Sequence, residues 1–399
     1  MEKILYLVHR IPYPPNKGDK IRSFNILRAL SEKYEVYLAS FIDDPDDQQY
    51  ISTVSKFCKQ YYLESLNPFK AKIQSLKGML TFNPLTLEYY SSKKIQQWVD
   101  EIINKYNIDR LLVFSSSMAQ YVDNSKYSNI HRVIDFVDID SDKWRQYADS
   151  KSFPLNWVYR REAKYLQNYE REIAIKFNYS MFVSNAEQQH FIRQHAFADE
   201  KVGYFDNGVD TDFFNPDIDV ASPYQPDDQV LVFTGAMDYW ANVDAVVWFT
   251  ENVYLKVRES HPDIKFYIVG TNPTDAVKSL ESHAGITVTG RVHDIRAYTQ
   301  YAVCAVAPLR IARGVQNKVL EAMSMAKVVI ASPEAMEGIR LCEDSEVTIA
   351  KNAGDYIKAI SSQLRSDSTA EAHVSRQCML ERYSWDAALN KLMNVLESD

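Results

Sequence analysis

Residues 306–331 contain the side chains best suited to bind a phosphorylated ligand. An apolar run leads into a short loop that contains Gly314, and a helical pattern begins near Gln316. Glycine lets a backbone approach a ligand closely, and the first turn of a helix offers unpaired N–H groups and a positive dipole. This strand, loop and helix therefore predict a diphosphate site.

Charged side chains accompany this predicted loop. Arg310, Arg313 and Lys318 add positive charge, and Glu321 lies about one turn into the helix. A carboxylate at that place can accept hydrogen bonds from ribose hydroxyls, so the set indicates a nucleotide. The alternative is that these residues form an ordinary solvated helix face, and for Lys318 the two interpretations are evenly balanced.

Three acidic triplets have the D-x-D spacing of a metal motif. They are residues 138–140, 210–212 and 217–219, in a chain that is rich in aspartate. Such short motifs arise by chance, so we predict no metal site here. Asp138 also follows an apolar strand, which leaves it open as a site residue that works without a metal.

The composition bounds the class of protein. The chain has 399 residues, 46% hydrophobic and 25% charged, which favours a globular protein of two or three domains. Its net charge of −8 argues against nucleic acid as the main partner. The four cysteines, Cys58, Cys304, Cys342 and Cys378, show no C-x-x-C pair, and we expect them to be reduced.

Hydrophobic segments long enough for export or membrane insertion are not found. The apolar run before His9 and Arg10 is too short for a signal peptide, and no window approaches a membrane span. We therefore expect a cytoplasmic protein, with peripheral contact at the inner face of the cytoplasmic membrane left open. Residues 144–171 mix aromatic and cationic side chains, which suits anionic lipid or a glycolipid. We favour a packed helix with a solvated face, because Glu162, Glu170 and Glu172 dilute the charge.

Short apolar runs alternate with helical patterns along almost the whole chain, which predicts βαβ units and parallel sheets. The predicted strands are residues 4–8, 34–41, 60–63, 111–114, 133–136, 181–184, 230–233, 266–269, 286–288, 303–307 and 328–331. A polar stretch with three prolines separates the two series. We predict an α/β fold with two doubly wound Rossmann-like domains. Their bounds are residues 1–206, a linker at 207–228, residues 229–380, and a last helix at 381–399 that packs on the first domain.

Several stretches together resemble the family-four retaining glycosyltransferases of GT-B fold. They are residues 207–214, 232–237, 288–294 and 306–331. Residues 9–25 and 133–144 narrow the resemblance to the sugar transferases of bacterial exosortase (PEP-CTERM) and exopolysaccharide systems. The resemblance implies two Rossmann-like domains facing across a cleft, the second binding the nucleotide and the first the acceptor.

The resemblance also implies roles for individual residues of the second domain. Glu321 matches the family's glutamate on the donor ribose, whereas Arg313 stands where a first glutamate is usual. The loop at Gly235 lacks the family's arginine and lysine, so we expect other cations of the donor loop to replace them. The implied donor-binding set is Arg310, Arg313, Gly314, Val315, Gln316, Asn317, Lys318, Glu321 and Gly235, with Gly290, Arg291 and Val292 at the base.

In the first domain, the resemblance places a glycine-bearing loop near the reacting sugar. Lys17, Asp19 and Arg22 are implied to bind the acceptor, and Gly18 and Asp138 to lie at the catalytic centre. Retaining transfer in this fold is thought to proceed by front-face attack, with the leaving diphosphate assisting deprotonation of the acceptor. Such chemistry depends on positioning and charge stabilisation, so it needs no strong base.

We therefore predict hexosyl transfer from a UDP- or GDP-sugar to a polysaccharide or lipid-linked acceptor, without a cofactor. Two alternatives remain open at this point: a nucleotide-sugar epimerase of the same fold, and a non-catalytic sugar- or nucleotide-binding scaffold. A dinucleotide dehydrogenase is disfavoured, because no G-x-G-x-x-G follows the first predicted strand.

Overall fold

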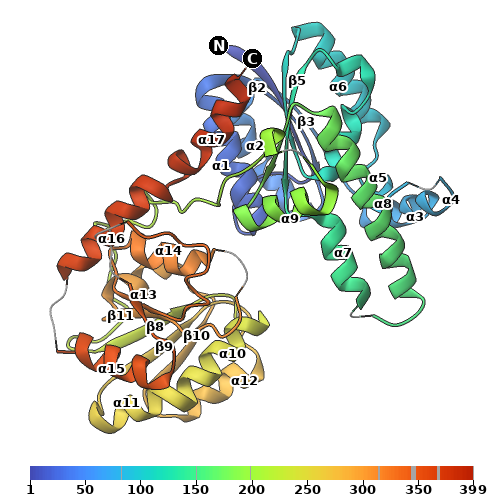
Figure 1. Ribbon diagram of the computed structural model, residues 1–399. Helices are drawn as coiled ribbons and strands as arrows, with labels where there is room; N and C mark the ends of the chain where they lie inside the picture. The colour runs from blue at the N-terminus through green and yellow to red at the C-terminus, as the bar shows by residue number, and fades with distance from the viewer. Residues whose placement is uncertain are drawn as a thin grey trace. The chain divides into compact units, whose positions relative to one another are not determined.

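The protein is described here from a computed structural model. The structure describes residues 1–81, 83–149, 151–197, 199–312, 315–342, 347–365 and 369–398. The chain forms two compact units. Unit 1 comprises Met1–Asp206 and Ala388–Asp399, and unit 2 comprises Asn207–Ala387. Each unit contains one sheet with helices on both faces (Figure 1).

Unit 1 contains a seven-stranded parallel sheet in the order β3-β2-β1-β4-β5-β6-β7. Its strands are β1 Glu2–Val8, β2 Tyr34–Ile42, β3 Gln60–Ser65, β4 Arg110–Phe114, β5 His131–Val137, β6 Tyr179–Phe182 and β7 Val202–Tyr204. Its helices are α1 Gly18–Lys33, α2 Ile51–Val54, α3 Pro68–Ser75, α4 Lys77–Thr81, α5 Leu85–Tyr89, α6 Lys93–Tyr106, α7 Asp140–Asp149, α8 Leu155–Lys176 and α9 Asn185–His195. The strand order reverses between β1 and β4, which makes this a doubly wound sheet.

Unit 2 contains a six-stranded parallel sheet in the order β10-β9-β8-β11-β12-β13. Its strands are β8 Val230–Thr234, β9 Lys265–Val269, β10 Ile286–Gly290, β11 Cys304–Ala307, β12 Val329–Ala331 and β13 Thr348–Ile349. Its helices are α10 Trp240–Phe249, α11 Leu255–Ser260, α12 Asp275–Lys278, α13 Ile295–Tyr301, α14 Asn317–Ser324, α15 Ala353–Gln363, α16 Thr369–Arg382 and the start of α17 Trp385–Glu397. The order reverses between β8 and β11, and ligands of such sheets bind beside that point.

The predicted fold class is confirmed, since both sheets are parallel, Rossmann-like and surrounded by helices. The strands that the sequence did not predict, β7 and β13, are three and two residues long and lie at sheet edges. Such short strands show no period of their own. The end of α17 belongs to unit 1, where Arg110 donates to the Leu396 carbonyl at 2.9 Å and Lys33 pairs with Glu397 at 2.7 Å.

A fully buried ion pair joins α1 to the sheet of unit 1. Nε of Arg22 lies 2.7 Å from Oδ2 of Asp135, and neither side chain is exposed. The guanidinium also stacks on Phe205, 3.5 Å from the ring centroid, and donates to the Phe205 carbonyl at 3.0 Å. The prediction that Arg22 binds the acceptor is therefore wrong. From the sequence alone, an arginine in this loop-to-helix motif is expected to contact a ligand. In the structure, α1 places the Arg22 side chain in the core.

One prediction about cysteine is also corrected. Cys342 and Cys378 form a disulfide with a Cα–Cα distance of 5.7 Å, although we expected both to be reduced. The sequence could not show this pair, because α16 brings together residues that are 36 positions apart. Cys58 and Cys304 are free, and burial raises the pKa of each thiol to about 12.

Among the described helices, none is both long and apolar enough to cross a membrane.

The buried ion pair predicts a large loss of stability when one partner is removed. We expect Arg22→Met to lower the free energy of unfolding by about 3–5 kcal/mol, because it leaves the Asp135 charge buried and unpaired. Urea unfolding followed by circular dichroism measures this. Arg145→Met is the matched control, since Arg145 pairs with Asp142 at 2.9 Å on the surface and should contribute less than about 1 kcal/mol. Equal losses in the two variants would contradict the structural role of Arg22.

Candidate functional site

A pocket of about 370 Å³ lies in unit 2 beside the point where the strand order reverses. It is formed by the end of β8, the start of α10 and the first turn of α14. Its lining residues are Asn207, Thr234, Gly235, Tyr239, Asn242, Ile295, Val315, Gln316, Asn317, Lys318 and Glu321. The structure thus brings Gly235 together with the predicted donor-loop residues from Val315 to Glu321, although they lie far apart in sequence.

Gly235 follows β8 directly, and only a glycine fits there. A Cβ atom at this position would lie 2.7 Å from Nδ2 of Asn242 and 3.1 Å from Nζ of Lys318. Behind it, a Cβ on Gly270 would lie 1.6 Å from the Gly235 carbonyl oxygen. The ends of β8 and β9 therefore pack backbone against backbone, and this leaves room for the two polar side chains.

Lys318 supplies a cation at the Gly235 loop. Its Nζ donates to Oδ1 of Asn242 and lies 4.1 Å from the centroid of the Phe233 ring. Nδ2 of Asn242 in turn donates to the Ala236 carbonyl at 2.9 Å. This arrangement places an ammonium where the sequence lacks the arginine and lysine of the resembling family. Burial lowers the pKa of Lys318 to about 7, against the opposing effect of the Glu321 charge.

Glu321 lies on α14, one turn after Lys318. Burial raises the pKa of its carboxyl to about 7, although the Lys318 charge opposes the shift. Within the described ranges, no side chain or backbone group donates a hydrogen bond to this carboxylate. A carboxylate that lines a pocket is suited to accept hydrogen bonds from ligand hydroxyls.

The first turn of α14 adds backbone donors to the same pocket. The helix begins at Asn317, and the side chain of its N-cap residue, Gln316, makes no capping hydrogen bond. The N–H groups of Asn317 and Lys318 therefore gain no cap from that residue. With the helix dipole and the Lys318 ammonium beside them, these groups favour an anion such as a diphosphate.

Arg310 lies elsewhere than we predicted. It forms a two-point ion pair with Asp244 of α10, with Nε 2.9 Å from Oδ2, and its side chain is half exposed. It lines a second pocket of about 560 Å³ together with Trp240 and Trp248, not the pocket of Glu321. The idea that Arg310 replaces the missing cations is thus not supported. Arg313 and Gly314, also predicted to contact the donor, lie outside the described residues.

The three residues predicted at the donor base lie at the end of β10. Gly290 has φ +64°, and a Cβ there would meet no atom within 4 Å. Arg291 is exposed, and Val292 packs partly against the core of unit 2. They do not line the pocket, whereas Ile295 at the start of α13 does. Contact of Gly290, Arg291 and Val292 with a base stays a prediction.

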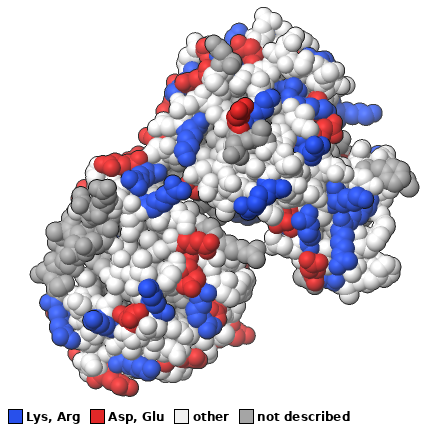
Figure 2. All heavy atoms as spheres, viewed as in Figure 1, with Lys and Arg blue, Asp and Glu red and all other residues white. Residues whose placement is uncertain are grey.

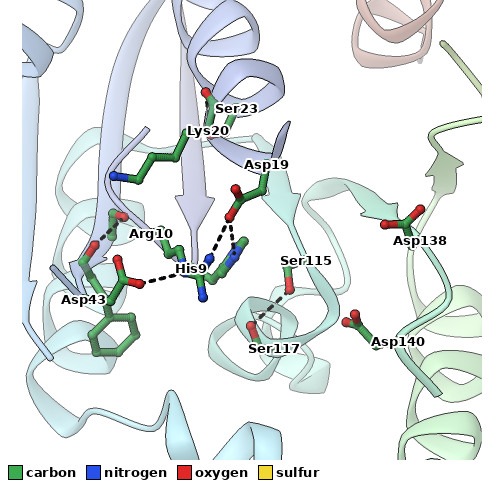
Figure 3. Close-up of polar contacts among 12 residues, drawn as sticks. His9, Arg10, Asp19, Lys20, Ser23, Asp43, Ser115, Ser117, Asp138 and Asp140 are labelled. Atoms are coloured by element: carbon green, nitrogen blue, oxygen red, sulfur yellow. Dashed lines mark hydrogen bonds and ion pairs between the residues drawn. The ribbon is translucent and has the colours of Figure 1, made fainter. Parts of the chain in front are cut away.

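In unit 1, the predicted acceptor loop leads into α1. Lys17 and Gly18 are exposed, and a Cβ on Gly18 would meet open space. Oδ2 of Asp19 lies 3.0 Å from Nη1 of Arg10 and 3.5 Å from Nε2 of His9 (Figure 3). Burial raises the pKa of Asp19, but the hydrogen bond from His9 and the charges of His9 and Arg10 hold it well below its usual range. Asp19 therefore remains ionised.

Asp138 follows β5 at a strained place. Val137 before it has φ +69°, which is rare for a β-branched residue and is a mark of functional sites. Oδ2 of Asp138 pairs with Nζ of Lys143 at 2.8 Å, and Asp140 accepts from the Ser116 hydroxyl at 2.8 Å. In the parts of the chain that are described, no three metal-binding side chains gather. The catalytic role of Asp138 and Gly18 stays a prediction.

The sequence did not predict several residues of the unit 2 pocket and of the loop before α1 in unit 1. Asn242, which positions Lys318, is a polar residue near the start of a mostly apolar helix, and that is a signal visible in the sequence. Gly270 repeats the pattern of a glycine directly after a strand. His9 and Arg10 belong to a motif that we recognised, but their charge pair with Asp19 depends on the turn between β1 and α1.

Comparison with known proteins identifies the domain that holds the pocket. Residues 228–366 match the family model described as "Glycosyl transferases group 1". That span includes all the lining residues except Asn207. Unit 2 thus carries a glycosyltransferase group 1 domain. No protein of curated function matches the sequence.

Solved structures match both units together. A glycosyltransferase from Rickettsia africae has a TM-score of 0.65 at 15% identity, covering 99% of this chain and 98% of that one. HepE from Anabaena, solved with UDP, has a TM-score of 0.63 at 14% identity and full coverage of both chains. WaaG, a glycosyltransferase of lipopolysaccharide biosynthesis, has a TM-score of 0.60 at 12% identity, covering 99% and 100%. At these identities the likeness shows the GT-B fold.

The raised pKa of Glu321 predicts a pH-dependent cost to stability. Between the unfolded value of 4.5 and about 7, the folded protein holds a proton that the unfolded chain releases, so stability falls as the pH rises. Glu321→Gln removes this cost. We expect it to stabilise the protein by about 3 kcal/mol near pH 8 and by much less near pH 4.5. Thermal unfolding across this range measures the difference.

Glu337→Gln serves as the control, because Glu337 is an exposed glutamate of the same unit. Lys318 titrates in the opposite sense above pH 7, so wild type must be compared with each variant at the same pH. A difference between wild type and Glu321→Gln that is constant with pH would contradict the shifted carboxyl.

Proposed function

We propose that the chain is a glycosyltransferase that uses a nucleotide-sugar donor. It moves a hexosyl group from a UDP- or GDP-sugar, with retention of configuration, to a polysaccharide or lipid-linked acceptor in exopolysaccharide or cell-surface glycan synthesis. The observation that carries the proposal is the pocket of unit 2, which combines the first turn of α14, the Lys318 ammonium and the Glu321 carboxylate. The group 1 domain that contains it supports the same activity.

Each part of the donor has a chemical counterpart in this pocket. The diphosphate takes the N–H groups at the start of α14 and the ammonium of Lys318, which together supply donors and positive charge. The ribose hydroxyls donate to Glu321. The Gly235 backbone, with no side chain in the way, lets the ligand approach Lys318 and Asn242 closely.

Catalysis in this proposal rests on the leaving group. As the bond between the sugar and the diphosphate breaks, negative charge develops on the diphosphate. Lys318 and the dipole of α14 stabilise that charge in a pocket already arranged to receive it. The diphosphate oxygen then takes the acceptor proton, so the site needs no separate strong base. Asp138 is held by Lys143, which favours a positioning role over proton transfer.

Uracil is the first base to test. The structures of Anabaena HepE were solved with UDP, with UDP and glucose, and with UDP-glucose. We therefore expect UDP to bind more tightly than GDP or ADP in a calorimetric titration. Lys318→Met and Glu321→Ala should each weaken UDP binding by about ten- to a hundredfold, because each removes hydrogen bonds that involve a charged group.

Lys358→Met and Glu337→Ala are matched controls, since both residues are exposed in unit 2 and lie outside the pocket. They should bind UDP like the wild type. If the folded wild type bound none of the three diphosphates, the donor site would be elsewhere and the proposal would fail. If the pocket variants and the controls bound UDP equally well, the assignment of Lys318 and Glu321 would be wrong.

Turnover separates the transferase from its two alternatives. With UDP-sugar and a glycan or lipid-linked acceptor, we expect one UDP released for each sugar transferred, with the anomeric configuration kept. Lys318→Met should lower the transfer rate by about a hundredfold or more, because charge on the leaving group is then unbalanced. An epimerase would change the sugar without releasing UDP, and a scaffold would bind UDP without either reaction.

A further inference from the structure

Six large exposed apolar side chains of unit 1 lie on two segments. Phe69, Ile73 and Leu76 follow one face of α3 at helical spacing and continue to its C-terminal cap. Phe153, Leu155 and Trp157 occupy the turn before α8 and its first residues. Their exposed fractions run from 49% to 80%. Large apolar side chains gathered this way on a surface mark a site of interaction.

The two segments belong to one surface, which we call the α3/α8 surface. Arg161 of α8 donates to the carbonyls of Gly78 and Asn83, the latter at 3.2 Å. Glu162 accepts from the backbone N–H groups of Leu85 and Thr86 at 2.7 and 2.9 Å. These bonds fasten the α3, α4 and α5 segment to the first half of α8, and Figure 1 shows the helices next to one another.

The α3/α8 surface is basic, although the chain as a whole carries −8. Its exposed cations are Lys70, Lys72, Lys77, Lys151, Arg160 and Lys164. Residues 66–87 contain no aspartate or glutamate. Asp149 pairs with Arg160 at 3.5 Å and neutralises that one cation. Figure 2 shows basic side chains over α8.

Two acidic residues expected to dilute this charge do not reach the surface. Glu162 and Glu170 are fully buried. Glu162 is held by Leu85 and Thr86, and Glu170 accepts from the backbone and hydroxyl of Ser141 at 2.9 and 2.6 Å. Two of the three glutamates expected to dilute the charge, Glu162 and Glu170, therefore do not do so, whereas Glu172 is exposed and α8 packs one face on unit 1 as predicted. Among the residues that the structure describes, no carboxylate pairs with the lysines that surround these apolar side chains.

We propose that the α3/α8 surface docks unit 1 on a bilayer that contains anionic lipid. The apolar side chains enter the interfacial region, and the surrounding lysines and arginines pair with lipid phosphates, since both contributions add for interfacial helices. The charge complementarity selects an anionic bilayer over another protein of this chain's own acidic kind. This inference does not depend on the donor pocket, which lies in unit 2.

Sedimentation with lipid vesicles tests the proposal on the full chain. We expect binding to vesicles that contain phosphatidylglycerol, weak binding to phosphatidylcholine alone, and loss of binding as salt is raised. The triple variant Lys70→Glu, Lys72→Glu, Lys164→Glu should bind these vesicles at least about tenfold more weakly than the wild type, because each cation contributes separately to binding. Brominated lipid should quench wild-type tryptophan fluorescence more than that of Trp157→Phe, since Trp157 enters the lipid.

The control is the triple variant Lys56→Glu, Lys105→Glu, Lys201→Glu, which changes the net charge equally at exposed lysines of unit 1 away from this surface. It should bind vesicles like the wild type. Equal loss in both triple variants would show unspecific charge attraction and overturn the proposal, as would no binding by the wild type at low salt. Self-association that Phe69→Ser with Trp157→Ser abolishes would assign the surface to a second copy instead. UDP binding should stay unchanged in every variant.

Discussion

Parallel pairing is the constraint on which both units depend. All the strand pairs in the described sheets are parallel, so every strand delivers its carboxyl end to the same edge of its sheet. In unit 2 the reversal of order at β8 and β11 keeps the following loops from covering that edge. Gly235 after β8, Gly270 after β9 and the first turn of α14 meet there. The position of the pocket is therefore set by the order of the strands, and the side chains determine what it can bind.

The two charged residues of this pocket lower the stability of the folded protein. A lysine with its pKa lowered and a glutamate with its pKa raised both mark charged forms that burial disfavours. The core would be more stable with apolar residues at both positions. Such a cost is retained where a ligand offsets it, because a diphosphate favours the ammonium and ribose hydroxyls favour the carboxylate. The Arg22–Asp135 pair is the contrast, since each partner there already satisfies the other within the protein.

The sequence predicted the features that depend on neighbouring residues, and it failed where a residue depends on a partner far away in the chain. The alternation of apolar runs is local, and it predicted both sheets. The strand, loop and helix around Lys318 and Glu321 are contiguous, so their grouping was also predictable. The misassigned residues depend on distant partners: Arg22 on Asp135, Arg310 on Asp244, and Cys342 on Cys378. Residue type alone does not show whether an arginine is available to bind a phosphate or is already paired with a carboxylate of the protein.

The same limit applies to the charge of a surface. Residues 144–171 contain six cationic and three acidic residues when the chain is counted in order, so the acidic residues offset half of the positive charge. Folding turns Glu162 and Glu170 inward, where backbone and hydroxyl donors hold them, while Lys151 and Lys164 stay in solvent. A carboxylate held inside by such donors cannot form an ion pair with a surface lysine. Surface charge is therefore a property of the fold, and an acidic chain can present a basic face.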